Sequence, residues 1–282
     1  MSACNSLRNA IIVSTMPNAS PIRKHLKSLA ERAPTPVRGA IRRVLQPGRY
    51  VFVSGEPTYN ADGLITVHNA DFVNDPRFNA AYEAGAATGS WAGLHIEWRT
   101  YIACWAADQV KHIEGDFVEC GVNRGGLSRA VCEYVDMATS GRSFYLLDTF
   151  NGVAEEYLTD AEKRLGFNQS MNGYYDECFD DVVQTFASFP NVKIVRGPVP
   201  ETLSQVTTDK VAYLSIDMNC VEPEIAAAEY FWDRIPSGGI VVLDDYAFVR
   251  HSLQKAAFDK FATRHDVQVL SLPTGQGLIF RP

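Results

Sequence analysis

The chain has 282 residues, of which 46% are hydrophobic and 21% charged, a composition that predicts a globular protein with a sizeable core and excludes a disordered or fibrous chain. Its net charge of −7 is unevenly distributed: residues 1–50 hold nine of the 26 Lys and Arg residues and only one of the 33 acids. The acidic remainder argues against a nucleic-acid partner. The six cysteines form no CxxC pair, and no apolar run approaches the roughly 18 residues of a membrane span, so we expect a reduced, cytoplasmic protein.

Residues 1–89 are predicted to form a basic N-terminal segment, separate from a main domain over residues 90–282. Apolar residues recur at helical spacing between residues 21 and 45 and are interrupted by prolines, which predicts two short amphipathic helices. We expect these helices to pack on the main domain or on a neighbouring subunit; contact with an anionic membrane surface is the alternative. A short strand over residues 49–53 and a turn at Asp62-Gly63 follow.

In the main domain, helical and strand-like patterns alternate. An aromatic helical segment over residues 91–112 leads into seven apolar runs, at residues 116–120, 143–148, 192–195, 211–217, 240–244, 267–272 and 277–280. Helical patterns lie between most of them, at residues 127–137, 175–189, 222–235 and 252–265. This alternation predicts a mostly parallel sheet with helices on both faces. Only four residues join the last two runs, too few for a parallel crossover, so we expect an antiparallel last strand.

A glycine-rich turn follows the first strong strand, within the segment Asp116–Ser128. Its glycines have the spacing G-x-x-x-G-G, whereas binders of a nucleotide pyrophosphate have G-x-G-x-x-G. We expect the glycines to let a cofactor approach the backbone closely. S-adenosylmethionine fits such a turn because it carries no diphosphate; an ordinary loop between strand and helix is the alternative.

Asp148 closes the next strand, 27 residues after Gly121. An acid at this place can accept hydrogen bonds from the hydroxyls of a ribose. The residue therefore favours an adenosyl ligand, although a loop carboxylate or helix cap would look the same in sequence.

Three further acids stand where two later strands end: Asp217 follows one strand, and Asp244 and Asp245 follow another. The carboxyl ends of parallel strands meet at one edge of a sheet, so we expect the three carboxylates to converge. Their repulsion and their oxygen ligands predict a hard cation such as Mg²⁺ between them, unless one or two of them only cap helices. His251 and Asp217 are the alternative general bases that would take a proton from an acceptor hydroxyl.

Several motifs of the main domain closely resemble those of one family. They are Asp116–Val122 followed by Arg124-Gly125-Gly126, Leu147–Gly152, Ser215–Met218, and Pro236–Ile240 running into Leu243–Tyr246. In order and spacing they are similar to the macrocin O-methyltransferase (TylF-like) family of S-adenosylmethionine-dependent enzymes. The resemblance implies a class I methyltransferase, Rossmann-like fold, and methylation of a hydroxyl on a sugar or a glycosylated natural product.

The resemblance also implies roles for individual residues. The metal ligands would be Asp217, Asp244 and Asp245. The cofactor contacts would come from the glycine turn, the loop after the second strand, Gly197 and Asp217; in the first two they would be Glu119, Cys120, Gly121, Val122, Arg124, Gly125, Ser128, Asp148, Thr149 and Phe150. The family further implies a homo-oligomer in which the N-terminal portion helps to close the site.

The chain departs from the family at one position of the metal motif. Many relatives have Asp-Gly-Asp where this chain has Asp217-Met218-Asn219, so Asn219 lacks the second charge. We therefore keep two other hypotheses open. One is a catechol-type O-methyltransferase acting on a phenol, with the aromatic residues of segment 91–112 as the floor of its pocket. The other is a scaffold that binds the cofactor without turnover.

Overall fold

The computed structural model describes residues 55–166 and 175–282. The helices predicted between residues 21 and 45 and the strand predicted at residues 49–53 lie outside this part of the chain. Asn60–Leu64 and Asn69–Pro282 form one compact unit, and residues 55–59 and 65–68 belong to a second. Within the described residues, no helix is long and apolar enough to cross a membrane.

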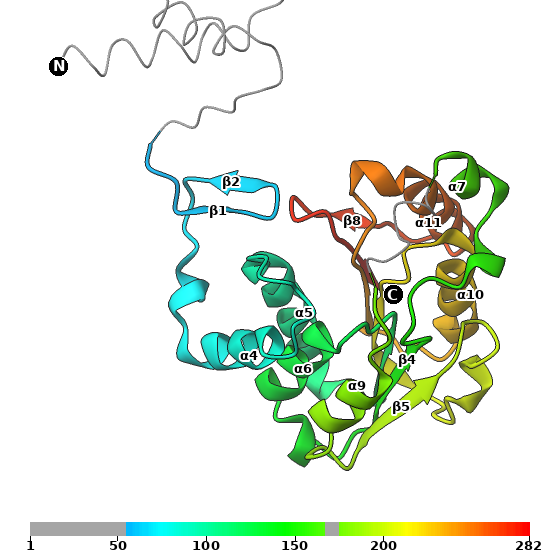
Figure 1. The fold of residues 1–282 in the computed structure, drawn as a ribbon, viewed down its shortest axis with the longest axis horizontal. Coiled ribbons are helices and arrows are strands. Elements are labelled where there is room, and N and C mark those ends of the chain that lie inside the picture. Colours follow the sequence, from blue (N-terminus) through cyan, green and yellow to red (C-terminus); the bar gives the residue numbers. More distant parts are fainter. Residues whose placement is uncertain (1–54, 167–174) are drawn as a thin grey trace, which may run out of the picture. The chain divides into compact units, whose positions relative to one another are not determined.

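A seven-stranded sheet forms the centre of the larger unit (Figure 1). Its order is β5-β4-β3-β6-β7-β9-β8, with bounds β3 Asp116–Cys120, β4 Phe144–Asp148, β5 Val192–Arg196, β6 Val211–Ile216, β7 Ile240–Leu243, β8 Leu270–Ser271 and β9 Gly277–Phe280. The first five of these strands in the order are parallel, and β9 runs antiparallel to both β7 and β8. The predicted fold, with its single reversed strand at the end of the chain, is confirmed.

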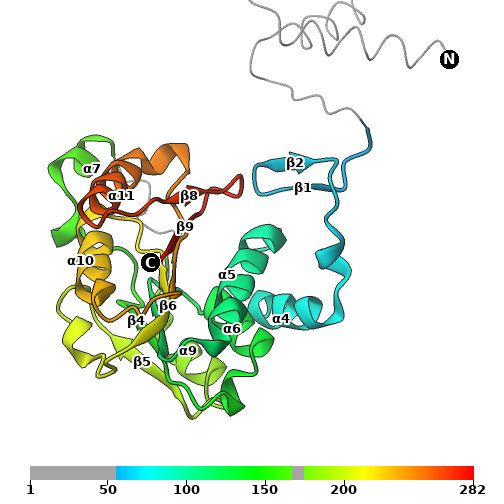
Figure 2. The same cartoon turned by 180° about the vertical axis from the view of Figure 1, so that it is seen from behind.

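Helices cover both faces of this sheet (Figures 1 and 2). One face packs against α5 Glu97–Gln109, α6 Gly126–Tyr134 and α9 Phe179–Thr185, and the other against α10 Val221–Trp232 and α11 Ser252–Arg264. Side chains that alternate along each strand supply the two cores: Phe117 and Phe144 point to the first face, Val118 and Tyr145 to the second. Burying each such side chain contributes about 1.5–3 kcal/mol, so both helical layers are firmly attached.

Four shorter elements complete the description: β1 Tyr59–Ala61, β2 Leu64–Thr66, α4 Pro76–Ala86 and α7 Asp160–Arg164. The predicted turn at Asp62-Gly63 joins β1 to β2, with φ +50° and +76° at its two residues. Two positive φ angles define the tight hairpin turn that Asp-Gly favours. α4 belongs to the compact unit that contains the sheet, although the sequence prediction assigned it to the N-terminal segment.

Several elements are shorter than predicted. α5 begins at Glu97 and not at residue 91, because the positive φ angles of Ala92 and Gly93 are not helical. α9 covers only Phe179–Thr185 of the predicted range 175–189. β8 covers two residues because Val267 donates its backbone N–H to Ala262 O at the end of α11 and so belongs to the helix end.

Candidate active site

The glycine turn between β3 and α6 packs directly against the end of β6. Gly121 has φ +90°, and a Cβ there would lie 1.9 Å from the backbone O of Asp217. Gly125 has φ +84°, and a Cβ there would lie 2.7 Å from the ring of Phe186. We expected these glycines to make room for a ligand; in the structure the chain's own packing already requires both.

Asp148, at the end of β4, holds this turn in place. Its Oδ2 accepts hydrogen bonds from the backbone N–H groups of Val122 and Asn123, at 2.5 and 2.8 Å. Its Oδ1 accepts one from the N–H of Phe150, at 2.7 Å. The carboxylate therefore joins the loops that follow β3 and β4, and this role was not visible in the sequence.

A first pocket lies beside these two loops and encloses about 740 Å³ of empty space, open solvent at its mouth included. Asp148, Thr149 and Phe150 form part of its wall, and Gly197 after β5 and Asp217 after β6 form another part. With Gly121 of the glycine turn, six predicted cofactor contacts from four different loops thus meet at one pocket.

A second pocket also borders the turn and encloses about 610 Å³ of empty space, open solvent at its mouth included. Its walls include Trp91, Arg99, Glu119 and Asp244. The two pockets have four wall residues in common, namely Gly121, Asn123, Tyr175 and Asp217. A ligand in each pocket would therefore meet the other at Gly121 and Asp217.

Four of the predicted cofactor contacts line neither pocket. Cys120 and Ser128 are fully buried in β3 and α6. Arg124 forms an ion pair with Asp181, at 2.6 Å, and Gly125 is the residue before α6. These four residues therefore belong to the packing around the turn and not to the pocket walls.

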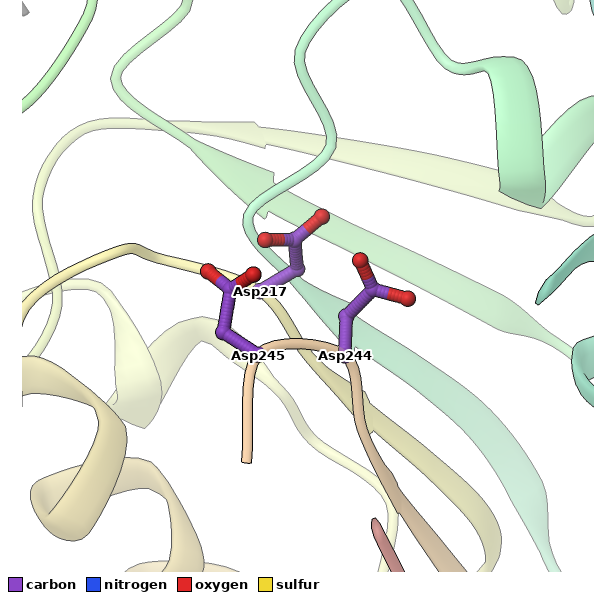
Figure 3. Close-up of side chains that lie close together, drawn as sticks. All are labelled: Asp217, Asp244 and Asp245. Atoms are coloured by element: carbon purple, nitrogen blue, oxygen red, sulfur yellow. The ribbon is translucent and has the colours of Figure 1, made fainter. Parts of the chain in front are cut away.

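The three predicted metal ligands do converge (Figure 3). One carboxylate oxygen from each of Asp217, Asp244 and Asp245 lies within 4.8 Å of the other two. β6 and β7 are adjacent and parallel, with Ile216 opposite Leu243, so the acids that follow them emerge side by side. Strand order alone thus places the cluster at the carboxyl edge of the sheet.

Burial and mutual repulsion make two of the three acids, Asp217 and Asp245, hard to ionise. Burial, with Asp244 and Asp245 beside it, raises the pKa of Asp217 well above its ordinary value. Burial and Asp244 raise the pKa of Asp245 to about 7. The Oδ2 of Asp245 is buried and has no hydrogen-bond partner among the described residues, although His251 Nδ1 lies 3.3 Å away. An oxygen left in this state suits a hard cation as its partner.

Three polar residues of the site were not predicted from the sequence. Arg99 Nη1 donates to Asp244 Oδ2, at 2.8 Å, and Arg99 Nε donates to Asp62 Oδ2, at 2.7 Å. Gln276 Nε2 donates to Asp244 Oδ1, at 2.9 Å. These partners lie 32 to 145 residues from Asp244 in the chain, so only the folded structure brings them together.

Burial shifts the pKa values of two further polar residues of the site, His251 and Glu119. His251 Nδ1 lies 2.9 Å from Gln254 Nε2 as well as near Asp245, and burial lowers the pKa of its imidazole. Glu119 lines the second pocket; its Oε2 has no hydrogen-bond partner in the described ranges, and burial raises its pKa to about 8. Asn219, the departure from the family motif, donates to Asp217 Oδ1 at 3.4 Å.

Comparison with known proteins gives matches of three kinds. A family model described as macrocin O-methyltransferase (TylF) matches residues 99–271. A curated relative from Streptomyces olivaceus, 8-demethyl-8-(2,3-dimethoxy-alpha-L-rhamnosyl)-tetracenomycin-C 4'-O-methyltransferase, is 30% identical over 146 residues, which is 48% of this chain and 54% of that protein. The chain thus spans about half the length of the curated relative it matches.

One solved structure shows the same fold, and another is similar over most of the chain. The O-methyltransferase NovP is 19% identical, with a TM-score of 0.61 over 72% of this chain and 97% of that chain. CalS11, a calicheamicin methyltransferase, is 15% identical, with a TM-score of 0.49 over 95% and 96% of the two chains. Because the family model covers well over half of the residues and the fold agrees, the chain belongs to the macrocin O-methyltransferase (TylF) family of S-adenosylmethionine-dependent enzymes, as the sequence predicted.

Proposed function

We propose that the chain transfers the methyl group of S-adenosylmethionine to a hydroxyl of a sugar, in a glycosylated natural product or a glycan, with the help of Mg²⁺. The observation that carries this proposal is the meeting of the two pockets at Gly121 and Asp217. The adenosyl part of the donor in the first pocket and the acceptor in the second would approach each other there. The donor is already activated, so holding the reacting atoms in line supplies most of the acceleration.

In this proposal the first pocket holds the adenosyl part of the donor. Three backbone N–H groups keep the carboxylate of Asp148 in place, which leaves about one of its roughly four lone-pair sites for a ribose hydroxyl. Thr149, Phe150 and Gly197 would contact the same part. Glu119 faces the second pocket next to Gly121, and its unpaired oxygen would accept from the ammonium group of the donor's amino-acid part.

Asp217, Asp244 and Asp245 would hold the metal. Their oxygen-only donor set fits Mg²⁺, as does the buried Oδ2 of Asp245, which has no hydrogen bond among the described residues. When bound, the ion would orient the acceptor hydroxyl and lower its pKa. Asp217 lines both pockets, so its carboxylate would face the acceptor as well.

Asp217 and His251 stay the two proposed proton acceptors. His251 Nδ1 lies 2.9 Å from Gln254 Nε2 and 3.3 Å from Asp245 Oδ2, so its imidazole borders the carboxylate cluster. The lowered pKa of its imidazole keeps that ring neutral near pH 7, as a base requires. Asn219, at the variable position of the motif, has no charge and cannot take this part.

A sugar hydroxyl is supported by the curated relative, whose name specifies 4'-O-methylation of a rhamnosyl tetracenomycin. A phenol is the second proposed acceptor, because Trp91 lines the second pocket and stacks on Tyr82 with ring centroids 4.8 Å apart. The homo-oligomer and the cytoplasmic location stay predictions. The membrane or subunit contact of residues 1–50 falls outside the described residues.

A transfer assay with labelled S-adenosylmethionine tests the proposal. Rhamnosides and other deoxysugar glycosides are compared with catechols, each with Mg²⁺ and with chelator. We expect label in the glycosides only, loss of transfer with chelator, and loss in Asp217→Ala but not in the exposed control Asp233→Ala. Label in catechols alone would favour the phenol hypothesis. Transfer to neither class, with the cofactor bound, would favour a scaffold.

A further inference from the structure

Arg99 is shared between two carboxylates that come from different ends of the chain. Its Nε donates to Asp62 Oδ2 at 2.7 Å, and its Nη2 to Asp62 Oδ1 at 3.3 Å. Its Nη1 donates to Asp244 Oδ2 at 2.8 Å. The guanidinium thus grips Asp62 with two nitrogens and Asp244 with one, the fork geometry that lysine lacks.

The carboxylate of Asp62 lies where it competes with Asp244 for the guanidinium of Arg99. It is the first residue of the tight β1–β2 turn, with φ +50°. Although it belongs to a turn, its side chain is only 16% exposed, and that of Arg99 is 17% exposed. Solvent therefore screens the pair poorly, and the charge of each partner is felt strongly by the other.

Arg99 carries one positive charge, and Asp62 and Asp244 compete for it. Arginine does not lose its proton in proteins, and both acids raise the pKa of Arg99 further despite its burial. The share of this charge that neutralises Asp244 depends on how much is drawn to Asp62. Asp244 is the cluster member in contact with Arg99, and its other oxygen is bonded to Gln276.

We propose that Asp62, acting through Arg99, sets the affinity of the carboxylate cluster for a divalent cation. With Asp62 charged, the guanidinium is drawn away from Asp244 and leaves it more negative. Without that charge, Arg99 neutralises Asp244 and competes with the cation. By linkage, a cation in the cluster pushes Arg99 toward Asp62 and tightens the turn that holds it.

Arg99 also lines the second pocket, so this coupling acts on the wall that the acceptor would meet. Asp62 and Arg99 are positioning residues in this scheme. The inference rests on the metal site of the proposed function.

Binding of Mn²⁺, followed by electron paramagnetic resonance with no acceptor present, tests the coupling. The proteins are the wild type, Asp62→Asn, Arg99→Met and the double variant. Asp71→Asn, an exposed acid bonded to Asn69, is the control for a simple loss of charge. We expect Asp62→Asn to weaken Mn²⁺ binding about fivefold or more, less than twofold in the Arg99→Met background, and Asp71→Asn to leave it unchanged.

The outcomes separate the two proposals. Equal weakening by Asp62→Asn in both backgrounds, with Mn²⁺ bound by the wild type, overturns the coupling alone. No Mn²⁺ binding by the wild type overturns the proposed metal site together with the coupling. If Arg99→Met does not fold, Arg99→Lys replaces it, because lysine keeps the charge but cannot bind both acids at once. Asp62→Asn must then weaken Mn²⁺ binding less in the lysine background than in the wild type. An equal weakening contradicts the proposal.

Discussion

Replacing Asp217 by Asn should make the metal-free protein more stable while abolishing methyl transfer. The carboxylates of the cluster lie within 4.8 Å of one another; two unit charges at that separation repel by about 3.5 kcal/mol at an effective dielectric constant of about 20. Protonation relieves part of this repulsion, since the pKa of Asp217 lies well above its ordinary value and that of Asp245 is about 7. We therefore expect a gain of about 1–3 kcal/mol in the free energy of unfolding at pH 8.

The sign of the pH dependence follows from the raised pKa values. Below about pH 3, Asp217 and Asp245 are protonated in both the folded and the unfolded chain. As the pH rises toward and beyond 7, the unfolded chain ionises freely but the folded cluster resists, so stability is lost with rising pH. The gain from Asp217→Asn should accordingly be smaller at pH 5 than at pH 8.

Urea unfolding in chelator at the two pH values measures this gain, with exposed Asp233→Asn as the matched control. Adding Mg²⁺ should stabilise the wild type and leave Asp217→Asn nearly unchanged. An Asp217→Asn variant less stable than the wild type at pH 8 would refute the idea that the three carboxylates repel one another.

Three further results are expected. Asp148→Ala should weaken S-adenosylhomocysteine binding at least tenfold, measured by calorimetry, because the glycine turn loses the acceptor of its N–H groups. The exposed control Asp160→Ala should have no such effect. Unchanged binding by Asp148→Ala would exclude the anchoring role. Mg²⁺ affinity should rise between pH 6 and pH 8, because Asp245, with a pKa of about 7, must lose its proton to bind the ion; a flat titration would contradict this. Glu162→Ala should lower the free energy of unfolding by about 2–3 kcal/mol in urea, since the buried carboxylate accepts from the N–H of Val221 at the start of α10; a loss below 0.5 kcal/mol would argue against that role.

The sequence allowed the fold and the acidic cluster to be predicted for the same physical reason. Apolar runs of strand length fix which residues end each strand, and parallel order puts those ends at one edge. Asp217, Asp244 and Asp245 follow directly from this rule, and their convergence is now observed. The Asp-Gly turn was predictable because only a few residue types accept positive φ at both positions.

The rest of the site depends on tertiary contacts that no local pattern encodes. Arg99 appeared only as one residue of an aromatic helix, and its two acidic partners lie 37 and 145 residues away in the chain. Asp148 was expected to bind a ribose, yet three backbone N–H groups of its own chain already donate to its carboxylate. Gly121 was expected to leave room for the ligand, whereas the backbone of Asp217, at the end of β6, already leaves no space for a side chain there. Arg99 and Asp148 form hydrogen bonds within the fold, and Gly121 is required by its close contact with the backbone.

A crystal structure with S-adenosylhomocysteine and Mn²⁺ would test the central claim most directly, by locating the metal through its anomalous scattering. The account predicts one peak between Asp217, Asp244 and Asp245, with the nucleoside against Asp148 in the first pocket and the sulfur facing Asp217. A metal bound away from the three carboxylates, or a nucleoside in the second pocket, would contradict it.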